Sequence, residues 1–137
     1  MEKSERLKEI ARQNFEKWSQ ALLTKDPKAV AALYSEDASF LPTVSPDFKH
    51  GTVEAEEYFI HFLEKNPEGK VVEETVQLLN QDSHHEEVCY LHSGLYDFLL
   101  DDGQGGRKTV QARFSFVWVK TNAGWKILHH HSSVKPA

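Results

Sequence analysis

The hydrophobic pattern of this chain changes near Gly69, and this change predicts the class of its fold. Before it, apolar residues recur at three- and four-residue steps over 4–24, which predicts an amphipathic helix. After it, segments rich in β-branched and aromatic residues predict four strands, at 70–79, 87–100, 109–120 and 125–133. Because short, turn-rich connections join these strands, we expect an antiparallel meander. Helices followed by strands predict an α+β fold, with the helices on one face of a curved antiparallel sheet.

Shorter segments lie between the first helix and the strands. The Asp-Pro pair at 26–27 predicts the start of a second helix that turns Tyr34 inward. A proline limits the apolar stretch 39–44 to an edge strand or an irregular piece. A third helix carries Tyr58 and stops near 66–67, where Asn-Pro ends the pattern. A sheet of this size, covered by helices on one side, is expected to curl into an open cone.

Composition narrows the class of protein. The 137 residues predict one domain, 1–137, and a net charge of -5 with scattered cations argues against nucleic-acid binding. The single cysteine, Cys89, excludes a disulfide framework and a multi-cysteine zinc module. The chain has no run of about 18 apolar residues, and its charged start lacks a signal core. We therefore expect a cytoplasmic protein that binds neither membrane nor nucleic acid.

The chain has eight histidines, and three are consecutive, His129, His130 and His131. On a strand, alternate residues face opposite sides, so His129 and His131 share one face and His130 the other. An H-x-H pair can bind a metal, but a catalytic zinc usually needs a third ligand, which His92 or Glu56 could supply. We favour histidines that are hydrogen-bonded in a pocket or at an interface, and we expect no metal and no cofactor.

Several segments together resemble a known superfamily. They are KDPKAVAALYSEDASFLPTV, GLYDFLL, ARFSFVWVK and GWKILHHHSSVKP. This chain resembles the nuclear transport factor 2-like (SnoaL-like) superfamily, which has a cystatin-like α+β cone. Within the superfamily it is most similar to small bacterial homologues of the calcium/calmodulin-dependent kinase II association, or hub, domain. The resemblance implies a pocket between helices and sheet, and self-association through the sheet as a homodimer or a higher even-numbered assembly.

The resemblance also implies roles for individual residues. Arginine positions of the hub pocket correspond to His92, Phe116 and Ser132, of which only His92 could become cationic near neutral pH. The implied pocket, for a small polar or anionic molecule, is lined by Tyr34, Tyr58, His92, Tyr96, Phe116, His130 and Ser132. Alternation along the strands directs Arg113, His129 and His131 towards an interface or an ion pair. The ion-pair partner of Arg113 could be Asp97 or a residue of a second copy.

Three functions are compatible with these features. The favoured one is a self-associating, ligand-binding domain without catalysis, since no catalytic motif is found. The alternative is a small isomerase or hydrolase of the SnoaL or ketosteroid isomerase type, with His92, Asp97 and His130 as acid–base candidates. A third is an adaptor that binds another protein on its outer sheet face.

Overall fold

A computed structural model describes residues 2–43 and 45–137 of the chain. The helices are α1 (Lys3–Leu23), α2 (Pro27–Ala31) and α3 (Gly51–Phe62), followed by the short 3-10 helix η1 (Leu63–Lys65). The strands are β1 (Tyr34–Leu41), β2 (Lys49–His50), β3 (Glu68–Gln81), β4 (Glu87–Asp101), β5 (Arg107–Thr121) and β6 (Gly124–Val134). None of the helices in the described ranges is long and apolar enough to cross a membrane.

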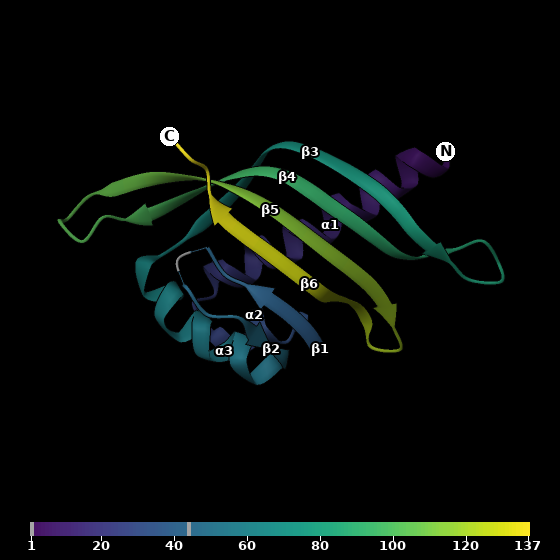
Figure 1. Cartoon of the computed structure of the whole chain (residues 1–137), viewed down its shortest axis with the longest axis horizontal. Helices are drawn as coiled ribbons and strands as arrows, with labels where there is room; N and C mark the ends of the chain where they lie inside the picture. The colour runs from purple at the N-terminus through teal and green to yellow at the C-terminus, as the bar shows by residue number, and fades with distance from the viewer. Residues whose placement is uncertain (1, 44) are drawn as a thin grey trace.

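The strands form one sheet in the order β2-β1-β6-β5-β4-β3. The four long strands pair antiparallel as predicted, whereas β1 pairs parallel to β6 and makes the sheet mixed. The long strands curve over α1, and α2 and α3 lie near β1 and β2 at the lower end of the sheet (Figure 1). The α+β cone expected from the sequence is confirmed, and its sheet is mixed rather than purely antiparallel.

Local capping explains where α2 begins but not where it ends. The Asp26 carboxylate accepts a hydrogen bond from the Lys28 backbone N–H at 3.0 Å, as the sequence predicts. The helix ends at Ala31, and Tyr34 opens β1 instead of extending the helix. β1 lies between β2 and β6 and stops before Pro42. Of the stretch predicted as an edge strand or irregular piece, Val44 lies outside the described residues.

Burial alternates along the long strands and defines two sheet faces. The inner face carries fully buried side chains such as Tyr96 and Phe116, on which the α1 residues Phe15 and Trp18 pack. The outer face carries the intervening residues, which are half-buried or exposed, and no described helix covers it. Any function that depends on side chains in the core must therefore use the inner face.

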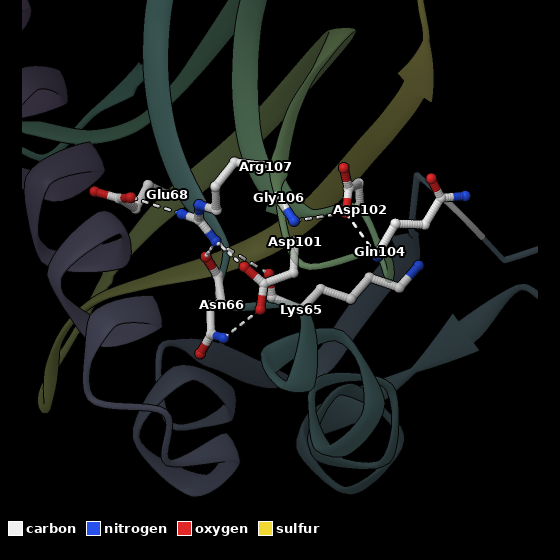
Figure 2. A network of polar contacts seen from close by, with 8 residues as sticks. All are labelled: Lys65, Asn66, Glu68, Asp101, Asp102, Gln104, Gly106 and Arg107. Carbon is white, nitrogen blue, oxygen red and sulfur yellow. Dashed lines mark hydrogen bonds and ion pairs between the residues drawn. The ribbon is translucent and has the colours of Figure 1, made fainter.

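A polar network ties the β4–β5 hairpin to the start of β3 (Figure 2). The Arg107 guanidinium donates to Asp101 Oδ1 and Glu68 Oε2, both at 2.7 Å, and to the Asn66 carbonyl oxygen at 2.8 Å. Asn66 has a left-handed backbone (φ 51°), and its side chain donates to Asp101 at 2.5 Å. The hairpin turn itself is held by the Asp102 carboxylate, which accepts from the backbone N–H groups of residues 104 and 106. This network fixes one end of the sheet against the turn after η1.

Candidate functional site inside the cone

His130 lies at the centre of a buried hydrogen-bonded array on the inner face. Its Nδ1 is 2.8 Å from the Tyr34 hydroxyl of β1, and its Nε2 is 3.1 Å from the Tyr96 hydroxyl of β4. The Tyr96 hydroxyl in turn donates to the Ser132 hydroxyl, which is hydrogen-bonded to Thr43. The array therefore joins three strands and ends at Thr43, just after β1.

The partners of Tyr34 and Tyr96 assign the direction of the hydrogen bonds to His130. The Tyr34 oxygen accepts from the Trp18 indole N–H at 3.1 Å, so its own proton is free to go to His130 Nδ1. Because Tyr96 donates to Ser132, the Tyr96 oxygen accepts from His130 Nε2. This assignment gives a neutral imidazole with its proton on Nε2, and it leaves both ring nitrogens satisfied.

Aromatic packing explains why the imidazole is neutral. The His130 ring stacks on Phe116 with centroids 4.0 Å apart and on Phe40 at 5.0 Å, and Trp18 meets its edge at 5.5 Å. Burial holds the pKa of His130 well below its ordinary value of 6.5, and positive charge on its two neighbouring histidines would act in the same direction. Burial likewise raises the pKa of Tyr34 and Tyr96. At neutral pH the array can donate and accept hydrogen bonds, but it carries no charge.

Side chains fill the cone almost completely. The internal cavity beside the array has a volume of about 10 Å³, which suits a single water molecule. It is lined by Trp18, Phe40, Thr43, Tyr58, Phe59, Phe62, Tyr96, Phe98, His130 and Ser132. A surface groove of about 290 Å³, between α3 and residues 45–49, shares Tyr58 and Phe62 with this cavity. These two aromatic side chains therefore border both the cavity and this much larger groove, called here the vestibule.

His92 is on the inner face but does not join the array. The Phe116 ring lies between the two imidazoles, with its centroid 6.4 Å from His92 and 4.0 Å from His130. His92 Nε2 meets Glu74 Oε1 at 2.9 Å, while its buried Nδ1 has no hydrogen-bond partner in the described chain. Burial lowers the pKa of His92, although Glu74 opposes the shift. His92 thus forms a separate pair with β3 and lines none of the cavities described here.

The remaining candidates lie on the outer face. Asp97 alternates with the buried Tyr96 and borders a surface hollow with Lys70 and Leu99. The structure therefore brings Asp97 together with neither His92 nor His130, the other two acid–base candidates. Arg113 is also exposed on this face, as alternation along its strand predicts.

Two of the consecutive histidines share the outer face. His129 Nδ1 is 2.7 Å from the Ser39 hydroxyl, and His131 borders a groove with Arg113. Burial and the charge of His131 lower the pKa of His129. Among the described residues, no group of three His, Cys, Asp or Glu side chains forms a metal-binding cluster.

Sequence reasoning missed three contributors to the site. Trp18 falls within the apolar pattern that predicts the first helix, and no sequence signal marks Phe40 or Thr43, yet all three contact the array or line its cavity. The stripe itself places Trp18 on the buried face of α1, but no local signal indicates that its indole N–H meets a tyrosine of β1. Phe40 and Thr43 reach the array because β1 pairs with β6, which is a long-range contact.

Comparison with known proteins matches nearly the whole chain to one family. The family model for the calcium/calmodulin dependent protein kinase II association domain matches residues 6–136. This chain belongs to that family. A solved association-domain structure from Xanthomonas campestris has 39% identity and a TM-score of 0.85, and the match covers 93% of this chain and 86% of that one. No curated protein matches the sequence.

More distant structures share the fold of this association domain. A nuclear transport factor 2-like superfamily protein from Salmonella enterica serovar Typhimurium has 19% identity and a TM-score of 0.76, over 97% of this chain and 94% of that one. A protein of cystatin-like fold from Nostoc punctiforme has 18% identity and a TM-score of 0.71, over 96% of this chain and 78% of that one. At this level of identity the likeness is one of architecture alone.

Proposed function

We propose that this association domain assembles with copies of itself through the outer face of its sheet. The observation that carries the proposal is that no described helix covers this face, although apolar side chains of two central strands lie on it. They are Leu91, Leu95, Leu99, Val117 and Val119. A sizeable exposed apolar patch on a soluble domain commonly marks an interaction site. Family membership adds support, since the family is named for association.

A two-fold pairing of identical faces gives a dimer, and further contacts between dimers give even-numbered assemblies. Sedimentation velocity over a range of concentrations tests this pairing. We expect dimers or larger even assemblies of the unmodified chain, and weakened assembly in Leu95→Lys, which places a charge in the centre of the patch. The matched control is Ile60→Lys, because Ile60 is an exposed apolar residue of α3, away from the sheet. A chain that stays monomeric at high micromolar concentration refutes the proposal.

We also propose that the cone takes up a small polar molecule beside Tyr96 and Ser132. The cavity at rest holds only about one water, so binding requires Tyr58 or Phe62 to move and join the cavity to the vestibule. The neutral array suits a hydroxyl or carbonyl group, and Lys49 and Lys65 of the vestibule suit an anionic end. These two lysines stand beside Asp47 and Glu57, so at most one anionic group is favoured there.

Native mass spectrometry of the intact chain, purified without harsh treatment, tests this uptake. We expect a small bound mass that is lost in Ser132→Leu, which fills the cavity, and retained in His84→Gln, which changes an exposed hairpin residue. A bound mass that survives Ser132→Leu places the ligand elsewhere and refutes the site. Asp97 lies on the opposite sheet face from His92 and His130, and Glu74, the carboxylate that meets His92, lines none of the cavities described here, so the acid–base alternative has less support than binding.

A further inference from the structure

One arginine of this chain lacks a carboxylate partner. Arg6, Arg12 and Arg107 each contact a carboxylate at 2.9 Å or less. Arg113 does not: among the described residues, its side chain makes one hydrogen bond, from Nε to the Ser133 hydroxyl at 3.1 Å. The guanidinium is thus held at one nitrogen, and its terminal N–H groups remain available.

The surroundings of Arg113 suit an incoming carboxylate. The outer-face groove beside it has a volume of about 310 Å³ and is lined by Arg113, Phe114, Ser115, His131 and Ser133. No acidic residue contributes to this lining, while two hydroxyls and an imidazole do. A planar guanidinium with free terminal N–H groups matches a carboxylate with two parallel hydrogen bonds.

Asp97 is the complementary group on the same face. In the β4–β5 register Leu95 pairs with Arg113 and Asp97 with Gln111, so Asp97 and Arg113 occupy diagonal positions. Diagonal side chains have Cα atoms about 7–8 Å apart, and no ion pair joins these two within the chain. The Asp97 carboxylate forms no hydrogen bond or ion pair with any described residue. Lys70 is its register partner on the neighbouring strand β3, and both residues border the same surface hollow.

Two-fold symmetry can bring the diagonal residues Asp97 and Arg113 into contact between two copies of the chain. When two outer faces pack about a two-fold axis that lies in the interface, residues on opposite sides of the axis exchange partners. If the axis passes midway between Arg113 and Asp97, Arg113 of each copy lies opposite Asp97 of the other copy. The same contact forms twice, so the interface gains two ion pairs in fixed register.

We propose that Arg113 of one copy binds the partner's Asp97 across the outer sheet face, and that this reciprocal pair sets the register of the dimer. The proposal rests on the proposed self-association through that face. It names the partner as a second copy of this chain, recognised by charge complementarity.

Charge exchange tests the pair. The dissociation constant of the dimer is measured by sedimentation velocity for Arg113→Glu, Asp97→Arg and the double variant, each checked for folding by urea unfolding. We expect each single variant to weaken the dimer at least about tenfold at low salt, because two like charges then face each other twice. The double variant should return to within about threefold of the unmodified chain. Arg12→Glu, an equal charge change on exposed α1, should leave the dimer unchanged.

Each contrary outcome has a distinct meaning. Weak assembly in Leu95→Lys with normal assembly in Arg113→Glu overturns the ion pair and leaves the sheet interface intact. Single variants that weaken the dimer without recovery in the double variant also overturn the pairing. A titration with acetate, followed by NMR chemical shifts, tests whether the groove binds free anions instead. If acetate shifts the signals of the unmodified chain but not of Arg113→Glu, and assembly is the same in both, the groove binds free anions and the proposal is overturned.

Discussion

Acidification should destabilise this domain because His130 is buried as a neutral ring. Its pKa lies well below 6.5 in the folded chain, whereas the unfolded chain restores the ordinary value. The unfolded state therefore binds more protons as pH falls, and stability decreases with it. Stability from this group is fully present above about pH 6.5 and is lost below it.

The size of the loss follows from proton linkage. If His130 stays neutral when folded, lowering the pH from about 7.5 to about 5.5 costs about 1.4 kcal/mol of unfolding free energy. His92 adds to the loss, because burial also lowers its pKa, but its contact with Glu74 makes its share smaller. The chosen range stays above the ordinary pKa of carboxyl groups, so histidines dominate the change.

Urea unfolding at fixed protein concentration measures this effect through tryptophan fluorescence, since Trp18 and Trp118 are both buried. In His130→Gln, which cannot titrate, the difference in unfolding free energy between the two pH values should shrink by about 1.4 kcal/mol. His84→Gln, on the exposed β3–β4 hairpin, should keep the full difference. An unchanged difference in His130→Gln would refute the assignment of His130 as a buried neutral ring.

Three further predictions test the fold and the array. Gly94→Ala should destabilise the chain by about 3 kcal/mol or more, seen in urea unfolding, because the added Cβ would lie 1.9 Å from the Glu73 carbonyl oxygen. Tyr96→Phe should cost about 2 kcal/mol or more in the same assay, because it leaves the Nε2 proton of the histidine and the serine hydroxyl without their partner. Arg107→Gln should lower Tm more than Arg12→Gln, since the first loses two carboxylates and a carbonyl contact and the second only an exposed helical pair. Equal Tm values for the two arginine variants would contradict the anchoring role of the hairpin network.

Part of the site was predictable because strand alternation is a local property. The rule that neighbouring strand residues face opposite sides separates His130 from His129 and places Arg113 outward, and the structure shows both. The same rule places Asp97 opposite Tyr96 and so apart from the buried histidines, although the acid–base alternative had grouped Asp97 with His92 and His130. Closeness in the sequence alone would wrongly have placed Asp97 beside His92.

The position of His92 was not predictable in the same way. Resemblance to the hub placed it in a shared pocket with His130, yet Phe116 lies between the two rings. Which inner-face side chains meet depends on the rotamers and sizes of residues from separate strands. The fill of the cone depends on the same packing, and it leaves a cavity of only about 10 Å³.

The three helices, the four long strands and the two faces of the sheet could be predicted from the sequence, because these depend on periodicity and on turn residues a few positions apart. The parallel pairing of β1 with β6, which carries Tyr34 and Phe40 to His130, is known only from the folded structure. The same holds for Trp18, which completes the array from α1. Tyr34 and His130 are 96 positions apart, and their contact forms only when the whole core packs, since each buried polar group must find its partner there.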